Sequence, residues 1–192
     1  MPDTLLEIFE ATARSHADRP AMARKRGGAW EKTTWREYRD AVRQAARALV
    51  ATGVEPGQGV VILAFNRPEW YVANLATIAV GARPAGIYTN TTPEQCRYIT
   101  EHAEAAVAVV ENRDSLVRLQ AAGGRPAGLK AIVLMDGEAT EPGALTWKDF
   151  LARGNDSHDA EVDRRTAAAG PDDVATLIYT SGTTGTPKGV ML

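Results

Sequence analysis

Val174 to Leu192 read VATLIYTSGTTGTPKGVML, and this stretch decides the fold of the chain. The apolar run that ends at Tyr179 predicts a strand, and Gly189 to Leu192 predict the beginning of a second strand. Between the two runs lies a loop of glycines, hydroxyl side chains and one lysine. The stretch therefore predicts a strand, a long polar loop and another strand, in that order.

The loop has the composition that a phosphate-binding loop requires. Gly182, Gly185 and Gly189 lack a Cβ atom, so the backbone can approach a charged oxygen closely. Lys188 adds a full positive charge on a flexible side chain. Rotatable hydroxyl donors come from Thr180, Ser181, Thr183, Thr184 and Thr186. Together these groups predict a polyphosphate site.

Two other interpretations of the loop fit less well. The Walker A pattern requires a glycine before the lysine and a helix after the loop, whereas Lys188 follows a proline and precedes the strand that begins at Gly189. A glycine- and threonine-rich hairpin without a ligand is the other alternative. Such hairpins usually need about two to five loop residues. A longer polar loop that contains a lysine favours the phosphate site.

The second strand of this hairpin is expected to be short. Val190, Met191 and Leu192 are too few residues for a stable ladder. We therefore expect the amides of Ser181 to Lys188 to exchange hydrogen faster than those of Leu177 and Ile178.

Residues 179–190, YTSGTTGTPKGV, resemble the signature of adenylate-forming, or AMP-binding, enzymes at every position. That group contains acyl-CoA synthetases, luciferases and the adenylation domains of peptide synthetases. Three further stretches resemble long-chain fatty acyl-CoA synthetases of the bubblegum type: NRPEW at 66–70, GARPAGIY at 81–88, and TPEQ at 92–95 with the following Tyr98 and Ile99. The resemblance covers essentially the whole chain.

The resemblance implies a reaction and a set of site residues. Such enzymes join a carboxylate to ATP, which gives an acyl-adenylate and pyrophosphate, and then transfer the acyl group to coenzyme A. It implies that Lys188 is catalytic, through its charge beside the leaving pyrophosphate, and that Thr180 is a Mg²⁺ ligand. The nucleotide-binding residues that it implies are Thr180, Ser181, Gly182, Thr183, Thr184, Gly185 and Lys188.

The resemblance also implies that residues 1–192 are an N-terminal fragment of the adenylation domain. The acidic motif that positions adenine and magnesium, the ribose-binding aspartate and the C-terminal lid domain with its lysine have no counterpart in this sequence. We therefore expect the chain to be inactive alone. Two alternatives stay open: an adenylation domain for another carboxylic acid, and a free-standing domain that binds a nucleotide or a partner without catalysis. The reading frame after Leu192 would distinguish them.

Composition limits the partners and the location. A net charge of −2 over 192 residues does not favour nucleic acid or an anionic membrane as a partner. Cys96 is the only cysteine, which rules out an internal disulfide and suits a reducing cytoplasm. The sequence MPDTLLEIFE does not have the pattern of a signal peptide, and no apolar stretch is long enough for a transmembrane span. We predict a cytoplasmic protein. Peripheral membrane contact of the parent enzyme and the oligomeric state stay open.

Strands alternate with helices along the rest of the chain. Apolar runs predict strands over residues 59–65, 84–88, 106–110, 130–135 and 174–179. The run at 59–65 has no polar alternation, which is typical of a strand covered on both faces. The alternation predicts an α/β fold with a largely parallel sheet and helices on both faces.

Capping residues mark the helix starts. The expected caps are Thr4, Thr34, Asn66, Thr92 and Asn112. In the first helix, one face is expected to consist of Leu5, Ile8, Phe9, Thr12 and Ala13. A hairpin is expected to turn at Gly27 and Gly28. Residues 136–173 are expected to be a connection that contains one helix, near 147–153.

The remaining candidate residues have simple structural interpretations. Cys96 is expected to be a buried thiol rather than a nucleophile, because no base partner is evident. Trp70 and Tyr71 could line an acyl tunnel, but packing of a helix on the sheet is the favoured role. The three histidines match no metal-ligand spacing and are expected at the surface: His16, His102 and His158.

Overall fold

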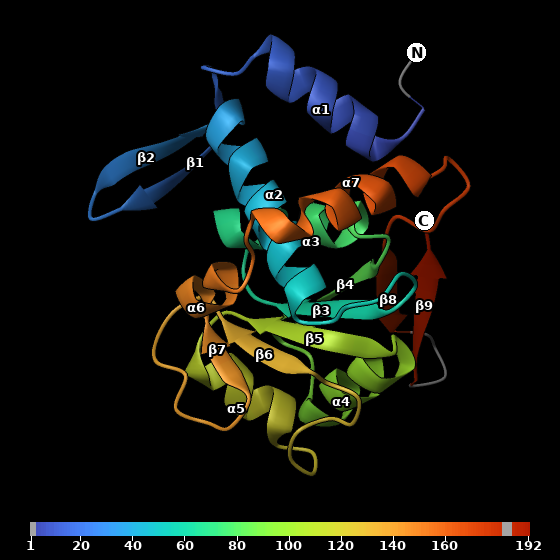
Figure 1. Cartoon of the computed structure of the whole chain (residues 1–192). Coiled ribbons are helices and arrows are strands. Elements are labelled where there is room, and N and C mark those ends of the chain that lie inside the picture. The colour runs from blue at the N-terminus through green and yellow to red at the C-terminus, as the bar shows by residue number, and fades with distance from the viewer. Residues whose placement is uncertain (1–2, 182–185) are drawn as a thin grey trace.

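The computed structural model describes residues 3–181 and 186–192. A seven-stranded sheet lies at the centre, with strand order β7-β6-β5-β3-β4-β8-β9 (Figure 1). Its strands are β3 (Gly59–Leu63), β4 (Arg83–Ile87), β5 (Ala105–Val110), β6 (Ala131–Leu134), β7 (Ala144–Thr146), β8 (Leu177–Ser181) and β9 (Pro187–Met191). A separate antiparallel hairpin consists of β1 (Pro20–Arg26) and β2 (Ala29–Thr34).

Helices cover both faces of the large sheet. They are α1 (Leu5–Ser15), α2 (Trp35–Ala51), α3 (Pro68–Ala79), α4 (Pro93–His102), α5 (Arg113–Gln120), α6 (Trp147–Ala152) and α7 (Asp159–Ala168), with a 3₁₀ turn at Asp156–His158. All adjacent strands are parallel except β8 and β9, which are antiparallel. The predicted fold class is confirmed.

The central strand shows why both faces are covered. Every residue of β3 is buried. Val60 and Ile62 pack with α2 and α3 on one side, whereas Val61 and Leu63 pack with α4 and α5 on the other. Successive strand residues point to opposite faces, so an unbroken apolar run requires a helical layer on each side.

Most of the predicted helix starts are confirmed, and one is wrong. Thr4, Thr34 and Thr92 each form a capping box, and the side chain of Asn112 accepts a hydrogen bond from the N–H of Ser115. Asn66 is not the cap of α3. Arg67 occupies that position without a side-chain cap, because Pro68 is the first helical residue and so fixes the boundary directly before itself.

The predicted buried face of α1 is partly wrong. Phe9 and Ala13 are buried, but the third buried residue is Leu6, and Leu5 and Ile8 are about half exposed. The ring of Phe9 meets that of Tyr38 edge-on, with ring centroids 5.1 Å apart. Because α1 lies on the outside of the helical layer, only one narrow side of it contacts the core (Figure 1).

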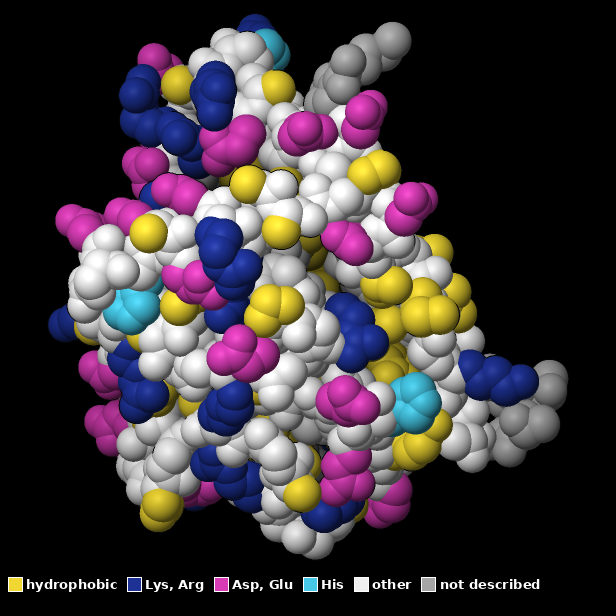
Figure 2. All heavy atoms as spheres, turned by 45° about the vertical axis from the view of Figure 1, so that its right-hand side comes forward, with side chains coloured by type: hydrophobic (Ala, Val, Ile, Leu, Met, Phe, Trp, Pro, Cys, Tyr) yellow, Lys and Arg dark blue, Asp and Glu magenta, His cyan; other side chains and the backbone are white. Residues whose placement is uncertain are grey.

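Exposed apolar side chains gather at the β9 edge of the sheet. Figure 2 shows apolar side chains grouped on the side of the molecule that carries this edge. Ile178, Val190, Met191 and Leu192 are all at least 38% exposed. An edge strand with exposed apolar side chains is open to pairing with a further segment or chain.

Residues 136–173 contain more structure than the sequence predicts. The predicted helix is confirmed as α6, but β7 and α7 were expected to be connection. The strand β7 has only three residues, all half-buried. Of α7, only Val162 and Arg165 are buried, so the helix has almost no apolar stripe that a periodicity could show.

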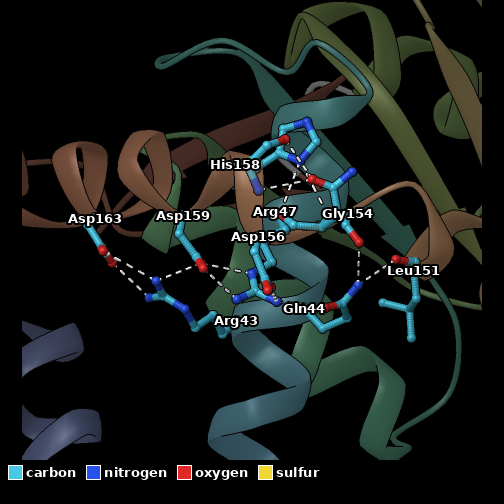
Figure 3. Close-up of polar contacts among 11 residues, drawn as sticks. Arg43, Gln44, Arg47, Leu151, Gly154, Asp156, His158, Asp159 and Asp163 are labelled. Carbon is cyan, nitrogen blue, oxygen red and sulfur yellow. Dashed lines mark hydrogen bonds and ion pairs between the residues drawn. The ribbon is translucent and has the colours of Figure 1, made fainter.

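Ion pairs to α2 hold α7 in place (Figure 3). Arg43 Nη1 lies 2.7 Å from Asp163 Oδ1, and Arg47 Nη2 lies 2.6 Å from Asp159 Oδ2. Arg165 Nη1 donates to the carbonyl oxygen of Val54 at 2.6 Å. The partners are more than 100 positions apart in sequence, so no local pattern could predict these contacts.

We predict that these ion pairs make the stability of the chain depend on pH. A hydrogen bond from Arg47 holds the pKa of Asp159 below its ordinary value, and one from Arg43 does the same for the pKa of Asp163. The contribution of these ion pairs to the stability of the fold is therefore complete at pH 7. It is lost as the pH falls from about 4 through the lower folded pKa values. At pH 7, the double variant Arg43→Met/Arg47→Met should unfold at a lower urea concentration than the unchanged chain. The difference between their urea midpoints should narrow by about pH 3.

The exposed Arg153 offers a matched control, because Arg153→Met removes a nearby arginine with no ion pair in the described part of the chain. That variant should follow the unchanged chain at both pH values. A gap of equal size at pH 7 and pH 3 for the double variant would contradict the assignment.

Candidate nucleotide-binding site

The hairpin of β8 and β9 carries the predicted phosphate loop. Its register pairs Thr180 with Lys188 and Ser181 with Pro187. Both Thr180 and Lys188 are exposed. The structure thus places these two predicted site residues opposite each other where the strands meet the loop, and their position leaves both side chains open to a ligand. Gly182, Thr183, Thr184 and Gly185 lie outside the described residues, and so does the side chain of Ser181.

The ladder of this hairpin is longer than the sequence predicts. The closing strand has five residues and begins at Pro187, so the expectation of a three-residue strand was wrong. Proline is tolerated as the first residue of a strand, where no N–H donor is needed. Lys188 therefore belongs to the ladder, whereas the predicted fast exchange concerns a segment of which residues 182–185 lie outside the described part.

Tyr179 anchors the hairpin to the sheet. Its side chain is 4% exposed, and its hydroxyl lies 2.8 Å from Nδ1 of His102. A Cβ atom on Gly189 would lie 3.2 Å from the Tyr179 ring, so glycine at this position allows the ring to approach the closing strand closely. His102 was expected to be an isolated surface residue. It is exposed, but it is the hydrogen-bond partner of the strand that carries the loop.

A groove of about 740 Å³ runs between α3 and β8 at the carboxyl ends of β3 and β4. Clefts at the carboxyl ends of parallel strands are where open α/β sheets bind ligands. Trp70 packs against the core and also lines the groove, and a Cβ on Gly86 would lie 3.4 Å from its ring. The favoured packing role of Trp70 is confirmed, and the groove lining is a second role. Tyr71 is 41% exposed and meets the Trp70 ring edge-on.

A charged cluster at the same edge of the sheet was missed by the sequence reasoning. Arg67 Nε donates to Glu69 Oε2 at 2.8 Å, and its Nη1 lies 2.6 Å from Asp136 Oδ2. Glu111 Oε2 accepts the N–H of Phe65 at 2.8 Å. The sequence contained a signal for two of these residues. Glu111 directly follows the buried strand β5, and Asp136 follows the buried strand β6 after one intervening residue.

These contacts keep the cluster ionised. Burial raises the pKa of Glu69, but the hydrogen bonds from Arg67 and from its own backbone N–H, together with the charges of Arg67 and Arg24, outweigh burial and place this pKa below its ordinary value. A hydrogen bond from Arg67 also lowers the pKa of Asp136. The cluster therefore ties together the loops that follow β3, β5 and β6, and it stabilises the edge on which the groove opens.

Other expectations have plain outcomes. Cys96 is buried, as predicted, and burial raises the pKa of its thiol to about 11. Within residues 3–181 and 186–192, no group of three or more His, Cys, Asp or Glu side chains could hold a metal ion. The same part of the chain contains no helix with the length and apolarity needed to cross a membrane.

Comparison with known proteins agrees with this geometry. The model of the family described as AMP-binding enzyme matches residues 9–192. The long-chain-fatty-acid–CoA ligase ACSBG2 of Xenopus laevis is 38% identical over the whole chain, and that of Gallus gallus is also 38% identical. The chain covers 26% and 25% of these two relatives, so it spans about a quarter of their length.

Among solved structures, an anthranilate CoA ligase, AuaEII, in complex with anthranoyl-AMP superposes with a TM-score of 0.80 at 26% identity. The match covers 100% of this chain and 35% of that protein. The family model covers nearly the whole chain, and the superposition supports the same fold. The chain belongs to the AMP-binding enzyme family.

Proposed function

We propose that this chain is the N-terminal portion of an ATP-dependent long-chain fatty acid–CoA ligase, and that the β8–β9 hairpin carries its phosphate-binding loop. One observation supports the site most strongly: Thr180 and Lys188 are paired across the ladder, and both are exposed. The proposed substrate class rests on the names of the relatives that match the whole chain.

Each residue has a distinct role in the proposed first step, in which a fatty acid carboxylate attacks ATP. Glycine amides and hydroxyl groups of residues 181–185 would donate hydrogen bonds to the phosphate oxygens. Lys188 would place its ammonium group beside the departing pyrophosphate, where negative charge develops. The acyl group would then pass to coenzyme A on parts of the enzyme that correspond to the rest of the relatives' length.

Magnesium is the metal that this chemistry implies. Mg²⁺ is usually held by few protein ligands together with substrate phosphates. The exposed hydroxyl of Thr180 fits one such ligand position, since it is an oxygen donor next to the loop. Mg²⁺ would supply charge neutralisation at the phosphates when bound. We also propose a cytoplasmic location, which fractionation of cells that express the protein would test.

The chain alone should have no ligase activity, because the groups that would bind ribose and activate the carboxylate are not among its residues. With ATP, Mg²⁺, coenzyme A and palmitate, pyrophosphate release should equal that of a heat-denatured sample. The Xenopus laevis relative, assayed in parallel, controls for the reagents. Release clearly above the denatured sample would contradict the proposal.

A second candidate function is a free-standing domain that binds a nucleotide or a partner without catalysis. The complete reading frame that contains this chain decides between them. A frame that continues to the length of the relatives supports the ligase. The complete protein is the product of that whole frame. A stop codon directly after Leu192 supports the binding domain. An adenylation domain for another acid is separated from the ligase by substrate preference.

A further inference from the structure

His102 joins α4 to the loop-bearing hairpin through a small aromatic cluster. The cluster consists of Tyr98, His102 and Tyr179. The imidazole of His102 meets the Tyr179 ring at 87°, with centroids 5.7 Å apart, and lies at 31° to the Tyr98 ring at 5.3 Å. In the described part of the chain, the side chain of Tyr179 makes one hydrogen bond, between its hydroxyl and Nδ1 of His102.

The buried phenol needs this partner. Tyr179 is 4% exposed, and a buried hydroxyl without a hydrogen bond is costly. Burial raises the pKa of Tyr179, so its hydroxyl keeps its proton and can donate. Nδ1 of a neutral imidazole can accept when the ring proton is on Nε2. His102 is thus chemically suited to hold the ring of Tyr179 in one position.

The position of Tyr179 determines the position of the proposed phosphate-binding pair. Tyr179 pairs with Gly189 across the ladder, and the next pair along the hairpin is Thr180 with Lys188. Gly189 lets the closing strand pack directly on the Tyr179 ring. A ring that is fixed from α4 on one side and covered by β9 on the other sets the register of both strands at the base of the loop.

We infer that His102 is a positioning residue that acts through Tyr179 to hold Thr180 and Lys188 in place for a polyphosphate ligand. The identity of the ligand rests on the proposed function. The mechanical link from α4 to the hairpin does not rest on it. His102 itself touches no phosphate in this scheme, and its effect reaches the ligand only through the hairpin.

Hydrogen exchange on the chain tests the mechanical link. His102→Ala should raise the exchange rates of the amides in 179–181 and 188–190 about fivefold, as expected for the loss of one hydrogen bond. Amides of β5 and β6 should keep their rates. His102→Asn, whose side-chain oxygen can accept from the phenol, should restore much of the protection. His16→Ala, at an exposed histidine beyond the end of α1, is the matched control and should change nothing.

Tyr179→Phe makes the test specific to the hydrogen bond. It should raise the same exchange rates, and adding His102→Ala to it should have little further effect, because both changes remove one interaction. Unchanged hairpin rates in His102→Ala, a uniform rise across β5 and β6, or full additivity with Tyr179→Phe would each overturn the inference.

Kinetics of the complete protein separate this inference from the proposed function. His102→Ala should raise the KM for ATP more than it lowers kcat, and His102→Asn should recover it. A faster-exchanging hairpin with an unchanged KM for ATP would overturn the phosphate-positioning role while leaving the mechanical link intact. A complete protein that shows no ATP-dependent activity at all, with the exchange result as expected, would instead contradict the proposed function.

Discussion

Lys188→Ala should lower the rate of fatty-acid-dependent exchange between ATP and pyrophosphate about 100-fold in the complete protein. Removing one group that stabilises developing charge typically lowers the rate by about this factor. Lys188 is exposed on β9, so its loss should leave the fold unchanged. The measurement is the exchange of labelled pyrophosphate into ATP at saturating palmitate.

Lys148→Ala is the matched control for this prediction. Lys148 is an exposed lysine on α6. This helix directly follows β7, which forms the other edge of the sheet from β9. The control should keep the full exchange rate, and both variants should unfold at the same urea concentration as the unchanged protein. Activity of Lys188→Ala within threefold of the unchanged protein would show that the lysine does not act on the phosphates.

Gly59→Ala should lower the free energy of unfolding of the chain by about 3 kcal/mol, the upper part of the range for overpacked interiors. A Cβ atom at this position would lie 3.0 Å from the carbonyl carbon of Ala103 and closer still to its oxygen. That backbone cannot move away easily, because the neighbouring carbonyl of Glu104 accepts the N–H of Gly59. Urea denaturation measures the change.

Gly170→Ala is the corresponding control. Gly170 has no positive φ, and the nearest atom to its Cβ position is a side-chain oxygen of Asp173 at 3.9 Å. This variant should keep or slightly raise the stability, because alanine restricts the unfolded chain. Similar losses in the two variants would mean that the close approach at Gly59 is relieved by local movement and does not limit the packing of β3.

Local signals in the sequence predicted the local structure well. The capping boxes at Thr4, Thr34 and Thr92 each fixed a helix start, because the Ncap and N3 residues lie within one turn and need no tertiary partner. The apolar run of β3 predicted a strand covered on both faces for a similar reason, since the lack of polar alternation can be read within the run itself.

Structure that depends on distant partners could not be predicted in this way. The helix α7 is held by Arg43 and Arg47 of α2 rather than by an apolar stripe, so its own sequence resembles a loop. Asn66 has the right chemistry for a cap, but Pro68 moved the boundary by one residue. The contact of His102 with Tyr179 spans 77 positions, and nothing near His102 in sequence indicates it.

In the candidate site, too, local features were predicted and features that depend on distant segments were not. The loop motif predicted the hairpin, and the structure places Thr180 opposite Lys188 in its ladder. The length of the closing strand was underestimated, because the residues before Gly189 were assigned to the loop rather than to the strand. The groove beside α3 is formed by residues from several separate segments, which only the folded chain brings together.

The most direct test of the account is the acid preference of the complete protein. If the chain is part of a long-chain fatty acid–CoA ligase, kcat/KM should rise from acetate to palmitate, by up to about fourfold for each methylene that becomes buried, which corresponds to about 0.8 kcal/mol. A series of straight-chain acids at fixed ATP and coenzyme A gives this slope. The highest kcat/KM is expected for a long-chain acid such as palmitate. A preference for acetate or for an amino acid would contradict it.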